Sequence, residues 1–375
     1  MATDEFELLE QAFQSNGTEG VFELLLERAR DEKNHRVLFG ARIMQVRQRI
    51  GLPLIETEPV LDLDGDRRTA YENAFRQAAR EAGELCLTAG DIPSAWTYFQ
   101  ALGDRAPVAA AIDKVTGAEN LDRVIEIAFR EGVNPRKGFE LILQHHGICS
   151  AITWFGSNTD YETRQHCLRL LVRTLYGDVA RALKETIAAA EGAAPETGSI
   201  ADLMACRPWL FEGNSSYTDS THLASILRFA PELSDTETQR MAAELADYGQ
   251  HLNPMFHFRG DPPFEEIYRD HGIYLRALLG EDIDTAIAHF RGKASDIGDP
   301  APAEVLIDLL VRLDRFDEAI QASKQYFPEE RATVPNCASL LQLCQMAGDY
   351  AALREAARQR GDPLSFVAGL IPGGS

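Results

Sequence analysis

Histidines and acidic residues gather around one segment in the second half of the chain, and their types suit metal binding. The segment from His251 to Phe264 is rich in aromatic residues and prolines and contains His257, and His271 follows soon after it. Asp247 lies four positions before His251, so both side chains share one face of the helix that we expect there. A carboxylate and two or three imidazoles are suitable ligands for Zn, Fe or Mn. The sequence therefore predicts a divalent-metal site formed by Asp247, His251, His257 and His271.

The same segment has the composition of a pocket wall. In extended backbone, successive side chains point to opposite faces. Phe256 and Phe258 would then anchor the segment on neighbouring helices, while His257 and Arg259 would face a ligand together. We expect His257 and His271 to serve as acid–base groups and Arg259 to hold an anionic substrate.

A purely structural interpretation of these residues stays open. In so acidic a chain, a helix face that carries Glu244 and Asp247 is typical of a solvated surface. His271 follows the apolar spacing of Phe264 and Tyr268, so it also fits a hydrogen-bonded histidine of the core.

Two other segments could carry chemistry. His145 and Cys149 lie four positions apart and would pair as imidazolium and thiolate if one helix runs through both. Gly147, between them, equally suits a helix end or a kink. The loop from Arg207 to Tyr217 is polar and aromatic, and it fits either a lid over the histidine-rich pocket or a loop that its aromatic rings pin to the core.

Motifs of common enzyme classes are missing. The chain has no G-x-x-x-x-G-K-[S/T], no G-x-S-x-G and no H-E-x-x-H pattern. Asp62 to Asp66 is acidic like a calcium loop, but Asn73 stands where a bidentate Glu is needed, so we interpret it as a loop and helix cap. The six cysteines show no C-x-x-C spacing, which argues against a zinc knuckle, a redox dithiol or a disulfide framework.

The charge balance narrows the choice of partners. Against 37 basic residues stand 58 acidic ones, a net charge of −21. Such a surface repels nucleic acid and anionic lipid and favours cationic partners. The N-terminus lacks the basic and apolar regions of a secretion signal, and no apolar run reaches the roughly 20 residues of a membrane helix. We expect a cytoplasmic protein that binds neither nucleic acid nor membrane.

The elements that must position these residues are helical, because apolar residues recur at steps of three and four nearly throughout. Strand-like alternation is confined to Val60–Asp64. We expect one helix to begin at a capping box of Ser234 and Glu237, and another at Asp261 before two prolines.

Four turns repeat one pattern, in which a polar turn is followed by an apolar residue that opens a helix. They are Gly90–Ala95, Glu281–Ala286, Asp314–Ala319 and Gly348–Leu353. Ile283 and Phe316 are 33 residues apart, and Phe316 and Tyr350 are 34 apart.

The helices after the first two turns carry an A-x-x-x-F pattern at Ala95 and Phe99 and at Ala286 and Phe290, and Gly83 supplies a small residue in the preceding helix. Spacing and pattern resemble the tetratricopeptide repeat (TPR), a helix–turn–helix unit of about 34 residues. The resemblance covers about residues 70–107 and 265–360. The third and fourth units depart from it, with Ser323 and Ala357 in place of the aromatic residue, and every first helix lacks the W-x-x-L-G-x-x-Y pattern.

The resemblance implies an all-α fold, a right-handed superhelical array of antiparallel helix pairs (a TPR-like α-solenoid) that is irregular in the middle. We expect three regions: residues 1–118 with one TPR-like unit, residues 119–264 with long loops, and residues 265–375 with TPR-like pairs. Such arrays leave a concave surface.

The leading functional hypothesis is binding of a protein segment or small ligand in an acidic concave surface. The alternative is an enzyme, metal-dependent or hydrolytic, with a histidine-rich pocket around residues 247–271. A structural subunit that docks a partner chain is the third interpretation.

Overall fold

Many helices begin at a polar capping residue or end at a glycine with a positive φ, and short turns connect them. The computed structural model describes residues 5–55, 64–117, 119–156, 160–193, 195, 198–212, 216–294, 299–327 and 337–371. In these ranges there are eighteen α-helices and no β-strand; one isolated bridge pairs Arg259 with Glu266. The all-α prediction is confirmed. The strand-like residues Val60–Leu63 lie outside the described ranges, and Asp64 caps a helix by accepting a bond from the Arg67 amide.

The chain divides into two compact units, residues 1–147 and 148–375. The three regions expected from the sequence stay predictions. No helix in the described ranges is both long and apolar enough to cross a membrane.

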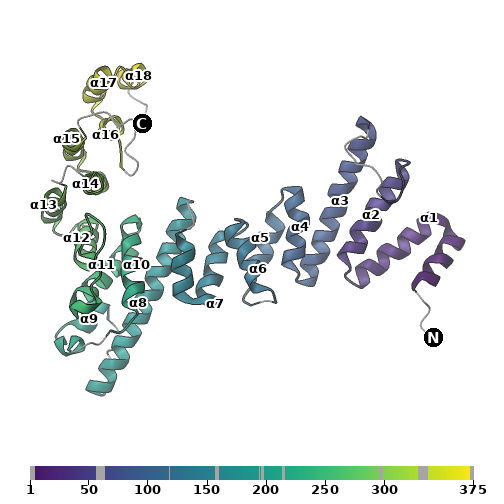
Figure 1. Ribbon diagram of the computed structural model, residues 1–375, viewed down its shortest axis with the longest axis horizontal. Coiled ribbons are helices and arrows are strands. Elements are labelled where there is room, and N and C mark those ends of the chain that lie inside the picture. The colour runs from purple at the N-terminus through teal and green to yellow at the C-terminus, as the bar shows by residue number, and fades with distance from the viewer. Residues whose placement is uncertain are drawn as a thin grey trace. The chain divides into compact units, whose positions relative to one another are not determined.

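The N-terminal unit is a series of helices (Figure 1). Its helices are α1 (Glu5–Asp31), α2 (His35–Arg49), α3 (Gly65–Ala89), α4 (Ile92–Leu102), α5 (Ala106–Ile112), α6 (Leu121–Ile125) and the first part of α7 (Pro135–Phe155). Helices α1 to α4 each pack on the next, and α6 packs on α4.

The α3–α4 pair shows how the sequence brings two helices close together. Gly90 ends α3 with a left-handed φ of 80°, and the Asp91 side chain caps α4. A Cβ built on Gly83 would lie 2.7 Å from the Phe99 ring, so only glycine leaves room for that ring. Ala95 and Phe99 are both fully buried. The small residue and the aromatic of the predicted unit therefore meet each other.

The C-terminal unit is also a series of helices (Figure 1). They are α8 (Tyr161–Glu191), α9 (Ile200–Met204), α10 (Ser220–Phe229), α11 (Thr236–His251), α12 (Ile267–Leu278), α13 (Ile283–Lys293), α14 (Ala301–Arg312), α15 (Phe316–Tyr326), α16 (Leu340–Met346), α17 (Tyr350–Gln359) and α18 (Pro363–Leu370). The helices from α10 onward pack on their neighbours in sequence, and α9 packs on α8 and α11. Single 3-10 turns lie at Pro208–Phe211, Ala230–Glu232 and Pro254–Phe256.

The repeated turns predicted from the sequence each join two packed helices. Helices α13, α15 and α17 begin at Ile283, Phe316 and Tyr350, one at each predicted turn. Phe290 on α13 is fully buried in a core that runs from α12 to α17. Helix pairing of consecutive elements is thus confirmed, whereas the superhelix itself stays a prediction.

Two predicted helix starts are wrong. Helix α11 is capped by Asp235, which accepts from the Thr238 amide, while Ser234 bonds to Gln165 instead. Helix α12 begins at Ile267 and not at Asp261, because residues 261–264 form a turn in which the Phe264 amide donates to the Asp261 carbonyl at 2.8 Å.

Candidate functional site

The segment between α11 and α12 forms a folded loop over the start of α12. After the turn Pro254–Phe256, the backbone extends through His257 to Arg259, which bridges to Glu266. The Gly260 amide donates to the Glu265 carbonyl at 3.0 Å. A side chain at Gly260 would collide with the Phe264 carbonyl, so the sharp return of the loop requires glycine there.

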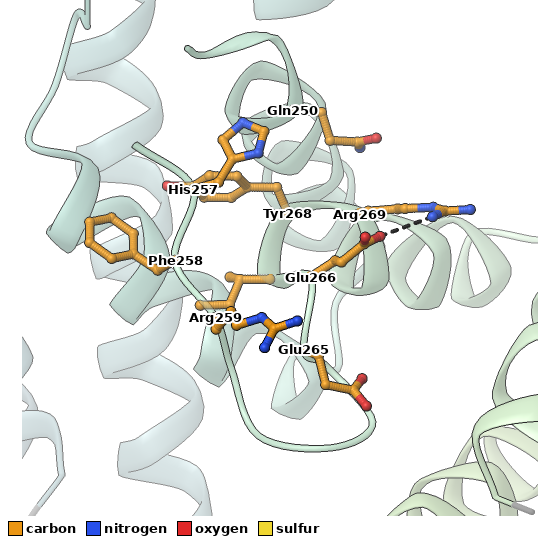
Figure 2. Close-up of a pocket in the computed structure, with 9 residues that line it drawn as sticks. Gln250, His257, Phe258, Arg259, Glu265, Glu266, Tyr268 and Arg269 are labelled. Carbon is orange, nitrogen blue, oxygen red and sulfur yellow. Dashed lines mark hydrogen bonds and ion pairs between the residues drawn. The ribbon is translucent and has the colours of Figure 1, made fainter. Parts of the chain in front are cut away.

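This loop and α12 enclose a pocket of about 410 Å³, which we call the Arg259 pocket (Figure 2). Its lining comprises Gln250, His257, Phe258, Arg259, Glu265, Glu266, Ile267, Tyr268 and Arg269. His257 and Arg259 therefore line one cavity, and Phe258 lines it with them.

Two of the predicted imidazoles are held by nearby groups. His251 Nδ1 lies 2.8 Å from the Asp247 carbonyl, and its ring lies against Phe211 with 5.2 Å between ring centroids. His257 Nε2 lies 3.0 Å from the Leu252 carbonyl. Both hydrogen bonds fix the ring orientation through the backbone of the same segment.

His271 is a core residue. Its side chain is 1% exposed, its Nδ1 lies 2.7 Å from the Ile267 carbonyl, and its ring stacks on Phe264 at 4.2 Å. Burial lowers the pKa of His271 to about 4. It does not line the Arg259 pocket.

The predicted metal ligands do not converge. In the described ranges, no group of three or more His, Cys, Asp or Glu side chains could hold a metal ion. Asp247 instead pairs with Arg276, and Glu244 accepts from the Tyr176 hydroxyl at 2.7 Å. The helix face that carries them joins α11 to other elements, which gives no support to the predicted metal site.

The main charged cluster that sequence reasoning missed is centred on Asp270. This fully buried carboxylate accepts from Lys293 Nζ at 2.8 Å and from the Glu266 amide at 2.8 Å, and it lies 2.9 Å from His289 Nε2. Lys293 also binds Glu265. Burial lowers the pKa of Lys293, but its two carboxylates outweigh burial and raise it overall. The cluster fixes the pocket loop to α13.

An aspartate–imidazole pair such as Asp270 and His289 also occurs in general-base catalysis. No hydrogen bond from a Ser, Thr or Cys side chain reaches His289 in the part of the chain that the structure describes. The pair joins α12 to α13.

A second cavity, of about 820 Å³, lies between the start of α8, the turn Ala230–Glu232, α12 and α14. We call it the α14 groove, and its walls include Tyr161, Pro231, Leu233, Tyr274, Val305 and Asp308. The guanidinium of Arg312 donates to the Pro231 and Leu233 carbonyls and so ties α14 to the turn.

The remaining candidate segments have structural contacts. Gly147 has a φ of 77° and interrupts α7, so the continuous helix needed to pair His145 with Cys149 is not formed. In the Arg207–Tyr217 loop, Phe211 packs on Tyr248 at 5.9 Å, which favours the pinned loop; residues 213–215 lie outside the described ranges.

No family model, curated protein or solved structure matches the chain.

Proposed function

We propose that this chain is a binding protein whose C-terminal unit accepts a segment of another protein in the α14 groove. The groove's volume of about 820 Å³ is within the range of about 300–1,000 Å³ typical of ligand sites. Its walls come from elements far apart in sequence, which gives an extended surface.

The observation that carries the proposal is the environment of Asp308. Its carboxylate accepts from the Tyr274 hydroxyl at 2.8 Å, and no Lys or Arg forms an ion pair with it in the described ranges. Two arginines also line the groove. The guanidinium of Arg312 donates to two backbone carbonyls and lies 6.0 Å from the centre of the Tyr274 ring, and that of Arg228 donates to the Arg259 carbonyl at 3.4 Å. A half-buried carboxylate without a cation favours a positively charged group of a partner.

The apolar walls define the rest of the partner. Pro231 and Val305 present aliphatic surface, whereas Leu233 is 0% exposed, and Tyr161 at the rim is 62% exposed. We therefore propose a segment that places a Lys or Arg near Asp308 and an apolar side chain beside it. This agrees with the net charge of −21.

Fluorescence anisotropy with two labelled peptides tests the proposal, one with alternating Lys and Leu and one with Glu in place of Lys. We expect only the basic peptide to bind, and Asp308→Asn to weaken binding on the order of ten-fold, because a charge-assisted contact is lost while the acceptor for Tyr274 is kept.

Asp317→Asn is the matched control, since Asp317 is an exposed acid on α15 outside the groove. Equal binding of both peptides, or equal effects of the two substitutions, would show that net charge alone attracts the peptide and would refute the groove.

A further inference from the structure

We propose that the Arg259 pocket binds a small organic carboxylate that also carries a hydroxyl or amino donor. This site shares no lining residue with the α14 groove, so it is independent of the function proposed above. The two carboxylates of the pocket wall are already paired, and the arginine between them is not.

The charge pattern of the pocket supports this proposal. Glu266 pairs with Arg269 at 2.9 Å, and Glu265 pairs with Lys293. The guanidinium of Arg259 makes no ion pair or hydrogen bond in the described ranges, although its backbone bridges to Glu266. Figure 2 shows Arg259 on the same wall as both glutamates, with a dashed contact only between Glu266 and Arg269.

A free guanidinium is permanently charged and presents paired N–H donors that match a carboxylate. Inorganic phosphate and other polyanions fit the pocket less well, because Glu265 and Glu266 lie in the same wall. A monoanion meets less repulsion from these two groups.

His257 specifies the second polar group of the ligand. Its Nε2 faces the Leu252 carbonyl at 3.0 Å, and since a carbonyl only accepts, Nε2 must donate. In the tautomer with its proton on Nε2, Nδ1 is an acceptor, and Nδ1 has no partner in the described ranges. Residues 257 and 259 are two positions apart on extended backbone, so their Cα atoms lie about 7 Å apart. One small ligand can span this distance.

One further wall is aromatic. Tyr268 lines the pocket, and its hydroxyl donates to the Phe256 carbonyl at 3.0 Å, whereas the Phe258 ring extends from the opposite side of the loop in Figure 2. A ligand with a flat or apolar body beside its carboxylate therefore finds complementary surface. An aromatic hydroxy acid combines all three features in a volume that fits about 410 Å³.

The test is isothermal titration calorimetry of the full chain with three probes: mandelate, mandelamide and phenylacetate. Mandelamide lacks the negative charge, and phenylacetate lacks the hydroxyl. We expect mandelate to bind at least about ten-fold more tightly than mandelamide and several-fold more tightly than phenylacetate, because each analogue leaves one pocket group unpaired.

Two variants locate the site. Arg259→Gln should abolish the preference for mandelate over mandelamide, whereas Arg181→Gln, on α8 outside the pocket, should leave it unchanged. Arg259 is exposed, so both variants should keep the melting temperature of the parent. Absence of mandelate binding, equal binding of mandelate and mandelamide, or an Arg259→Gln protein that keeps the preference would each overturn the proposal.

Discussion

The helix pairs α3–α4 and α11–α12 use the same packing device for different ends. In the first pair, Gly83 faces the Phe99 ring. In the second pair, Gly249 faces the Tyr268 ring, and a Cβ atom added to Gly249 would lie only 2.5 Å from that ring. Both rings are buried. Each pair thus approaches closely because one helix lacks a side chain where the other places an aromatic ring.

The difference lies in what the ring does at its far end. Phe99 has no polar atom and ends in an apolar core, whereas the Tyr268 hydroxyl reaches the Phe256 carbonyl and holds the pocket loop. Close beside it, the α12 helix buries His271 and Asp270. The two pairs thus share a packing contact and differ in the polar atoms on their buried faces, which in α11–α12 connect the helix to the pocket loop.

The largest expected difference between the two pairs appears on acidification. Since burial lowers the pKa of His271 to about 4, against about 6.5 when unfolded, the unfolded chain binds a proton in this window that the folded chain excludes. The contribution of His271 to the free energy of unfolding is therefore fully present above about pH 6.5. It decreases as the pH falls towards 4. The loss at pH 4 should be about 3 kcal/mol.

The two units of the chain need not unfold together, so the loss of stability must be measured in α12 itself. Hydrogen exchange followed by mass spectrometry provides this local measurement. Amides of α12 should exchange faster at pH 5 than at pH 7 after correction for intrinsic rates, and those of α4 should not. His271→Gln serves as the control and should flatten the pH dependence in α12. An unchanged slope in that variant would assign the effect to other groups.

The glycine contacts should produce the next largest effect. Gly83→Ala and Gly249→Ala should each destabilise the protein by about 1–3 kcal/mol, because the added methyl group displaces a buried ring. Gly40 on α2 has no atom within 4 Å of a built Cβ, so Gly40→Ala should stabilise by up to about 1 kcal/mol through helix propensity. Urea unfolding of the three variants checks both signs. If Gly83→Ala stabilised the protein, α3 and α4 would be able to move apart without a loss of packing energy.

The smallest effect should come from the hydroxyl that distinguishes the two rings. Tyr268→Phe removes the bond to the Phe256 carbonyl and should cost about 1 kcal/mol. The loss should be local, with faster amide exchange in residues 253–259 and weaker mandelate binding. The mirror substitution Phe99→Tyr should instead destabilise α3–α4, since it buries a hydroxyl without a partner. If Tyr268→Phe leaves the loop amides unchanged, the hydroxyl does not position the pocket.

The sequence predicted the helical class and the helix pairs because their signals are local: apolar spacing, small residues and turn glycines. The position of His257 and Arg259 in one cavity could also be approached, since extended backbone places residues two apart on one side. The centre at Asp270 could not, because its partners Lys293 and His289 lie on another helix, and no local rule relates them. The wrong cap prediction at Ser234 has the same cause. Its hydroxyl donates to the side chain of Gln165, which is 69 residues away in the sequence.

The bonds from Arg312 set an order of events during biosynthesis. Its acceptors, Pro231 and Leu233, are 81 and 79 residues earlier in the chain. At translation rates of about 5–20 residues per second, the turn Ala230–Glu232 waits on the order of 10 s for its guanidinium. Until then its carbonyls are open to water or to a chaperone, whereas pairs such as α3–α4 can close as soon as they leave the ribosome. The α14 groove is therefore completed later than a surface formed by two helices that are adjacent in the chain.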